Sequence, residues 1–135
     1  MTRFKNFEVE NAILCEDIRQ EVNNKKTLVG VYAGDILISS LPAPIDLAFY
    51  LDGKAFDREL FRIEVRLSGP GKSKAIAMLE LGATGESLGI AMITPRMQVL
   101  FEREGMFKIA IRDPDQSWKT IISKRVILRP ELASG

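Results

Sequence analysis

Histidine is absent from this sequence, and its absence excludes most familiar enzyme chemistry. Histidine is the usual general base near neutral pH and a very common metal ligand. Without it the chain cannot assemble a Ser-His-Asp or Cys-His catalytic group, nor a zinc site that combines cysteine with histidine. No complete catalytic motif takes its place, so the sequence predicts a non-catalytic protein with no cofactor and no bound metal.

Cysteine is nearly as scarce, since Cys15 is the single one and cannot form a disulfide within the chain. Its neighbours Glu16 and Asp17 would raise the pKa of the thiol, which favours a small buried residue over a reactive one. A surplus of charge is also lacking, because 19 basic residues face 18 acidic ones. A net charge of +1 provides no long-range field for nucleic acid or anionic lipid, and we expect neither as a partner.

Long apolar runs are missing too. No segment approaches the roughly 20 apolar residues that span a bilayer. Glu8, Glu10, Asn11, Glu16 and Asp17 interrupt the N-terminal segment, which therefore lacks the apolar core of a signal peptide. We expect a cytoplasmic protein with no membrane partner.

What the sequence does contain is a period of two, which is typical of β-strands. In "FRIEVRLS", Phe61, Ile63 and Val65 would face one way, with charged residues of alternating sign between them. Short runs of this kind, separated by glycine and proline turns, predict an all-β fold. We expect a single-domain antiparallel β-sandwich over residues 1–135, with a loose tail at 130–135. Its eight or nine strands are predicted near 8–15, 27–32, 36–40, 45–52, 61–68, 74–81, 97–103, 106–112 and 118–128.

Two turns stand out in this pattern. "NNKK" at residues 23–26 separates "CEDIRQEV" from "TLVGVY", and the simplest interpretation is a hairpin. "CEDIRQEV" and "DREL" could instead form one or two short helical turns. Asp113-Pro114-Asp115 is a strong turn sequence, because proline fixes φ and the aspartates can accept hydrogen bonds from nearby amides. It predicts a hairpin between 106–112 and 118–128.

Two short patterns imitate known motifs without their context. "GESLG" at 85–89 has the spacing of a nucleophile elbow, but there is no histidine and no following helix. "GPGKSK" at 69–74 suggests a phosphate-binding loop, but Arg66 occupies the position of its first glycine and the following "AIAMLEL" reads as a strand. We interpret both as turns.

The best candidates for ligand contact are one aromatic residue and several carboxylates. Trp118, which directly follows a turn, could stack on a sugar or a base or could be partly buried. Asp113 and Asp115 flank the same turn, and Glu16 and Asp17 lie near the first hairpin. Calcium needs several oxygen ligands from one loop, and the chain lacks the acidic run that supplies them. A small-ligand or carbohydrate-binding domain that uses these five residues is one hypothesis for the function.

The hairpin sequence also resembles a family of small bacterial proteins of unknown function. The matching segments are "CEDIRQEVNNKKTLVGVY" and "LPAPIDLAFYL", within roughly the first fifty residues. In that family an aspartate-containing strand end and a basic turn lead into an "L-x-G-V-[YF]" strand, followed by a proline-bearing segment. The resemblance implies a compact β-sandwich and carries no catalytic residues to any position.

Our first hypothesis for the function is a binding or assembly module that associates with a protein partner or with itself. The strands near 74–93 and 121–128 offer apolar residues on both faces, which exceeds what one inward face needs. Either a partner covers this surface, as in a homo-oligomer, or the second sheet of the same chain does. The residues concerned are Met78, Leu79, Met92, Ile93 and either Ile121 or Ile122.

Overall fold

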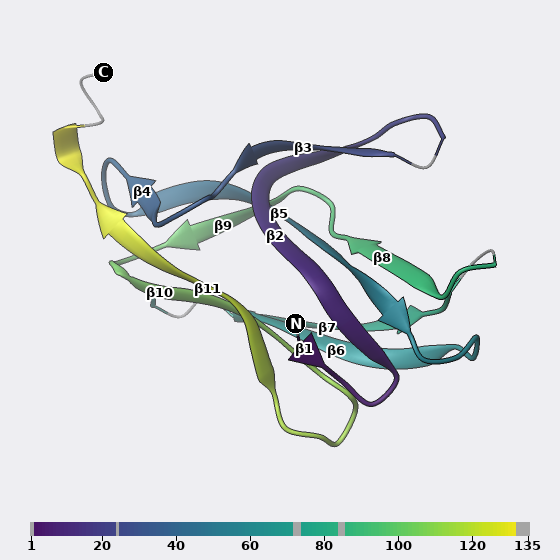
Figure 1. Ribbon diagram of the computed structural model, residues 1–135. Coiled ribbons are helices and arrows are strands. Elements are labelled where there is room, and N and C mark those ends of the chain that lie inside the picture. Colours follow the sequence, from purple (N-terminus) through teal and green to yellow (C-terminus); the bar gives the residue numbers. More distant parts are fainter. Residues whose placement is uncertain (1, 24, 72–73, 84–85, 132–135) are drawn as a thin grey trace.

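A computed structural model describes residues 2–23, 25–71, 74–83 and 86–131 of the chain. Within them it is all-β, as predicted, with strands and no α-helix (Figure 1). The strands are β1 (Thr2–Arg3), β2 (Phe7–Gln20), β3 (Lys26–Val31), β4 (Ile36–Ile38), β5 (Ala43–Ala55), β6 (Phe61–Ser68), β7 (Lys74–Leu81), β8 (Gly89–Ile93), β9 (Met97–Phe101), β10 (Gly105–Arg112) and β11 (Lys119–Leu128).

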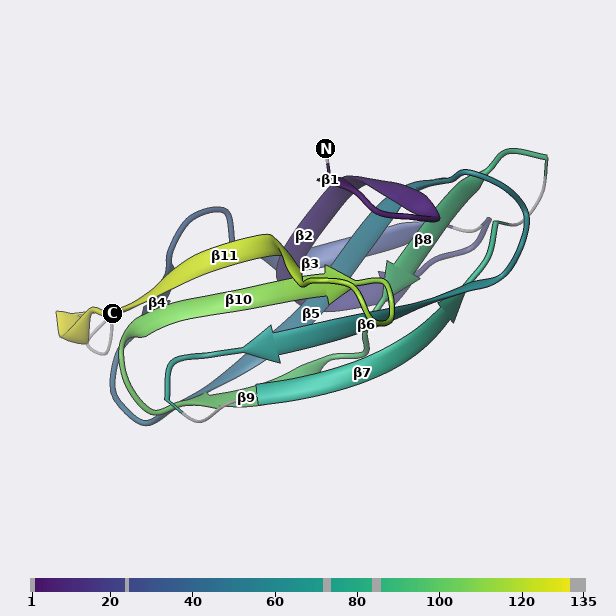
Figure 2. The same ribbon diagram turned by 90° about the horizontal axis from the view of Figure 1, so that it is seen from below.

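The strands form two curled sheets that pack face to face (Figures 1 and 2). Sheet 1 has the order β1-β2-β5-β8; β3 also pairs with β2, and β9 with β5. Sheet 2 has the order β4-β11-β10-β6-β7. All pairs are antiparallel except β4 with β11, so the predicted antiparallel sandwich contains one parallel pair.

The core between the sheets follows the predicted alternation. Along β6, Phe61, Ile63 and Val65 are buried, while Arg62 between them is exposed. Phenylalanines from both sheets fill the centre, and because each can bury roughly 150–250 Å², they contribute much of the apolar surface removed from water. The phenylalanines with fully buried side chains are Phe7, Phe49, Phe101 and Phe107.

The hairpin predicted between "CEDIRQEV" and "TLVGVY" is confirmed, and the alternative of short helical turns is wrong. Residues 15–20 continue β2 as a strand, because β3 pairs with them along the hairpin, with Ile18 opposite Leu28. Pairing with β3 across the hairpin here overrides a charged local sequence. Asn23, with φ of 61°, supplies the left-handed residue of the turn, a conformation that asparagine tolerates. Residues 57–59 form bends, and residues 57–60 contain no helix.

Other differences concern the strand list and the end of the chain. Up to nine strands were expected, and the structure adds β1 and β8. The predicted hairpin across Asp113-Pro114-Asp115 is confirmed by the pairing of β10 with β11. Of the tail predicted at 130–135, residues 132–135 lie outside the described residues.

A very close approach between strands occurs where β2 and β5 meet at Gly53. A Cβ atom built there would lie 1.9 Å from the backbone carbonyl oxygen of Glu8, beside a bulge in β2. We predict that Gly53→Ala destabilises the protein by about 3 kcal/mol, because backbone cannot move aside as a side chain can. Urea unfolding measures this.

Gly34→Ala is the matched control, because no atom lies within 4 Å of a Cβ at Gly34. It should shift the urea midpoint little in either direction. Equal midpoints for the two variants would contradict the packing described at Gly53.

Candidate functional site

The predicted ligand residues of the β10–β11 turn have different surroundings. Asp113 is buried, with 7% of its surface exposed, and its Oδ2 accepts a hydrogen bond of 2.9 Å from the backbone N–H of Lys5. Asp113 thus ties the N-terminal segment to sheet 2. Its Oδ1 is buried with no hydrogen-bond partner among the described residues. Asp115 is exposed and has a φ of 65°, which suits a turn position.

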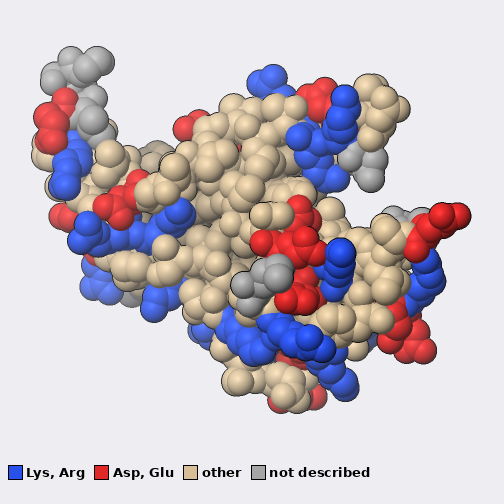
Figure 3. All heavy atoms as spheres, in the orientation of Figure 1, with Lys and Arg blue, Asp and Glu red and all other residues tan. Residues whose placement is uncertain are grey.

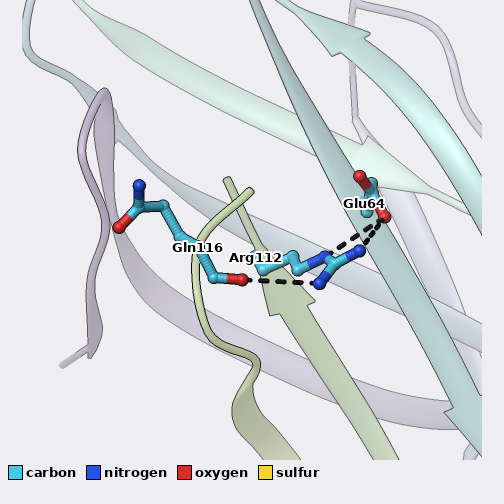
Figure 4. Close-up of polar contacts among 3 residues, drawn as sticks. All are labelled: Glu64, Arg112 and Gln116. Atoms are coloured by element: carbon cyan, nitrogen blue, oxygen red, sulfur yellow. Dashed lines mark hydrogen bonds and ion pairs between the residues drawn. The ribbon is translucent and has the colours of Figure 1, made fainter. Parts of the chain in front are cut away.

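Trp118 lies among arginines on the outer face of sheet 2. The guanidinium carbons of Arg66 and Arg112 are each 4.5 Å from the centroid of its ring, within the range of a cation–π interaction. Arg112 also contacts Glu64 through two nitrogens, at 3.0 and 3.2 Å, and donates to the carbonyl of Gln116 at 3.5 Å (Figure 4). A sugar stacking on Trp118 would therefore compete with guanidinium groups for the ring.

Glu16 and Asp17 lie on β2 of sheet 1, whereas the other three predicted ligand residues lie between β10 and β11 of sheet 2. The five residues therefore belong to different sheets. The side chain of Glu16 lies over Gly30, whose φ is 65°. Asp17 Oδ1 accepts a hydrogen bond from the N–H of Ile18. Among the described residues, no hydrogen bond or ion pair joins these two carboxylates to Asp113, Asp115 or Trp118, and no three potential metal ligands gather.

The thiol of Cys15 is fully buried between strands of sheet 1. Its Sγ donates to the carbonyls of Asp17 and Ala48, at 3.3 and 3.6 Å. Burial is the main reason that its pKa is raised above the ordinary value of 9.0. The protonated thiol therefore predominates near neutral pH.

A groove of about 810 Å³ lies between the β2–β3 hairpin and β8, and sequence reasoning missed it. Figure 3 shows the hollow at the right, below the hairpin. Tyr50 donates to Asp52 Oδ2 at 2.6 Å, and Asn11 donates to Asp52 Oδ1 at 2.9 Å. Lys26 and Lys54 also line it. Tyr50 faces this groove, on the opposite side of β5 from the buried Phe49.

Strand β7 exposes apolar side chains on both of its faces. Ile76 and Met78 point to the outer face of sheet 2 and are 57% and 58% exposed. Ala75 and Ala77, on the other face, are exposed as well. Met92 of β8, which has a similar local sequence, is 6% exposed because the two sheets cover it. The predicted apolar surplus thus divides into a covered strand, β8, and an uncovered one, β7.

β7 is also an edge strand of its sheet. Sheet 2 ends at β7, which pairs with β6 on one side, and within the described residues no strand pairs with its other side. Figure 2 shows β7 along the lower border of the molecule. Lys74 and Glu80 bear the charges of the strand, and residues 75–79 between them carry none. β7 therefore presents unpaired backbone groups flanked by apolar side chains.

Comparisons with protein-family models and with curated proteins found no match to this chain. The resemblance to a family of small bacterial proteins consequently stays a prediction. The described part of the chain holds no helix with the length and apolar character to cross a membrane.

The anchoring role of Asp113 can be tested by its removal. We predict that Asp113→Ala lowers the free energy of unfolding by about 1–3 kcal/mol, because the N–H of Lys5 loses its acceptor. Asp113→Asn should lose less, since its amide oxygen can still accept that bond. Urea unfolding compares the two, and an alanine variant as stable as the wild type would contradict this role.

The alkaline limit of stability should depend on the two tyrosines. Burial, with the hydrogen bond and charge of Asp52, raises the pKa of Tyr50 to about 12, and burial with nearby carboxylates raises the pKa of Tyr32 to about 12. The ordinary value is 10.0, so the unfolded chain loses these protons first. Stability is therefore retained below pH 10.0 and falls as the pH rises toward about 12.

Absorbance of the tyrosinate form measures these values directly, because Tyr32 and Tyr50 are the only tyrosines. In a Tyr32→Phe background, we predict that Asp52→Asn moves the pKa of Tyr50 from about 12 toward its ordinary value. The remaining elevation reflects burial. An unchanged pKa would show that Asp52 does not stabilise the protonated tyrosine.

Proposed function

We propose that this protein is a self-associating assembly module and that the edge of β7 is its contact surface. The observation that carries the proposal is an eight-residue edge strand, exposed on both faces and uncharged from residue 75 to residue 79. Natural sheets usually protect such edges with short strands, proline, bulges or central lysines, because an open edge pairs with other chains. β7 has none of these devices along residues 75–79.

Strand addition explains how this edge would contribute affinity. A second strand placed against β7 would pair its free N–H and C=O groups, and apolar side chains on both faces would pack against the incoming strand. The contact would bury Ile76 and Met78, which water now surrounds. The composition also supports a binding role, since the sequence contains no histidine and no complete catalytic motif.

We predict that the wild-type protein forms a species heavier than the 15.1 kDa chain, and that Met78→Lys returns it to the monomer. A lysine in the middle of an edge strand brings a charge into the contact, where it would lose its hydration. Light scattering coupled to size-exclusion chromatography, over about a hundredfold range of concentration, measures the mass.

Met106→Lys is the matched control. Met106 is also exposed, at 44%, but it lies on β10 in the interior of sheet 2. This variant should keep the mass of the wild type, and circular dichroism should show that both variants remain folded. A wild-type protein that is monomeric at all concentrations would contradict the proposal.

A second candidate function is the binding of a small polar ligand, and the groove at Tyr50 favours it over Trp118. The hydrogen bonds from Tyr50 and Asn11 hold Asp52 in a fixed orientation, and a preorganised polar group lowers the cost of binding. Thermal unfolding with a panel of mono- and disaccharides would test this function. It requires that a sugar raise the melting temperature of the wild type, and that the same sugar raise the melting temperature of Asp52→Ala less, each relative to its own sugar-free value.

A further inference from the structure

We infer that two copies of this chain pair through β7 in an antiparallel arrangement. The two-fold axis passes midway between Ala77 of one copy and Ala77 of the other, and is called below the axis at Ala77. The inference rests on the proposed function and specifies its geometry. The sequence of β7 around Ala77 carries the argument, since its charged and apolar residues are placed symmetrically about that position.

Symmetry limits the possible arrangements. A two-fold axis that joins identical edge strands into one continuous sheet must stand perpendicular to the sheet, because both copies then keep the same face outward. Directly opposed residues share a face, and successive residues alternate between faces. Opposed positions must therefore differ by an even number of residues. One residue then lies directly opposite its own copy, and the axis passes midway between these two copies.

With the axis at Ala77, every pair within residues 74–80 is favourable. Lys74 lies opposite Glu80 of the second copy, so opposite charges meet at both ends of the contact. On the same outer face, Ile76 lies opposite Met78. On the inner face, Ala75 lies opposite Leu79, and the small Ala77 lies opposite itself. Opposite charges and apolar pairs are the cross-strand combinations that stabilise antiparallel sheets.

Neighbouring registers are poorer. An axis through Ile76 would place Lys74 opposite Met78, and an axis through Met78 would place Glu80 opposite Ile76. Each sets a charge against an apolar side chain and no longer places Lys74 opposite Glu80 of the second copy. Charge complementarity therefore selects Ala77 and identifies the occupant of this edge as a second copy of the same strand.

The adjacent strand agrees with this register. Arg62 of β6 lies opposite Glu80 within one chain. In the pair of chains, Glu80 would stand between Arg62 on one side and Lys74 of the second copy on the other. The sign of the charge thus alternates across this row of the sheet, as in other stable sheet surfaces.

Cysteine cross-linking tests the position of the axis. In Ala77→Cys, the two new thiols would lie directly opposite each other, and oxidation should give a covalent dimer on non-reducing gels. Ala75→Cys is the matched control on the same face, because its thiols would be about 13 Å apart along the strands, beyond the reach of a disulfide. The native Cys15 is buried and should not contribute.

Charge reversal tests the same register without relying on a disulfide. Lys74→Glu or Glu80→Lys alone would create two like-charged pairs, and each should raise the dissociation constant of the dimer about tenfold. The double variant restores opposite charges, so it should recover most of the affinity. Glu80→Lys and the double variant both place the same new cation beside Arg62. The difference between their dissociation constants therefore reports the contact with position 74 alone.

The outcomes separate this inference from the proposed function. A dimer that Met78→Lys disrupts, but that shows neither the Ala77→Cys cross-link nor rescue by the double variant, would overturn the register and leave self-association intact. A wild-type protein that stays monomeric would overturn both. The cross-link, its absence in Ala75→Cys, and the rescue together support the two-fold axis at Ala77.

Discussion

Backbone hydrogen bonding is the constraint on which this structure depends. Every strand residue other than proline brings a donor and an acceptor, and in a sheet these groups find partners on neighbouring strands. The long strands β2 and β5 satisfy this requirement at the centre of sheet 1, where β2 pairs with β1, β3 and β5, and β5 pairs with β8 and β9. Sheet 2 is a simple series of five strands and therefore ends in two edges.

The two edges of sheet 2 differ in what they offer. β4 has three residues and contributes a short edge, with Ile36 and Ile38 buried. β7 has eight residues and is exposed over most of its length. A long, apolar and unpaired edge favours pairing with another chain. Self-association through β7 would therefore complete the hydrogen bonding that the single chain leaves open on this side.

Much of this fold could be predicted from the sequence, because alternation of apolar and polar residues reports directly on a half-buried strand. β6 and the turn at Asp113 and Pro114 are examples. β8 was missed, because glycines and Pro95 around a short apolar run indicate a turn. The hairpin that contains residues 15–20 could be predicted from its turn, whereas the alternative of a helical turn was wrong because β3 pairs with these residues.

The candidate site was less predictable, because it depends on how strands pack together and not on the local sequence. Met78 and Met92 lie in similar apolar segments, but Met78 lies opposite Glu64 on the outer face of sheet 2, whereas Met92 lies opposite the buried Leu51 between the sheets. Pairing between strands decides which face each residue occupies. Likewise, the cations around Trp118 come from β6 and β10, so its local sequence gives no sign of them.

The central claim is that the free edge of β7 becomes paired when two molecules meet. Hydrogen–deuterium exchange of the β7 amides, measured at low and high protein concentration, tests this claim most directly. The account predicts that exchange in residues 74–80 slows as the concentration rises, while exchange in the β2–β3 hairpin stays the same. Exchange in β7 that is fast and independent of concentration would contradict it.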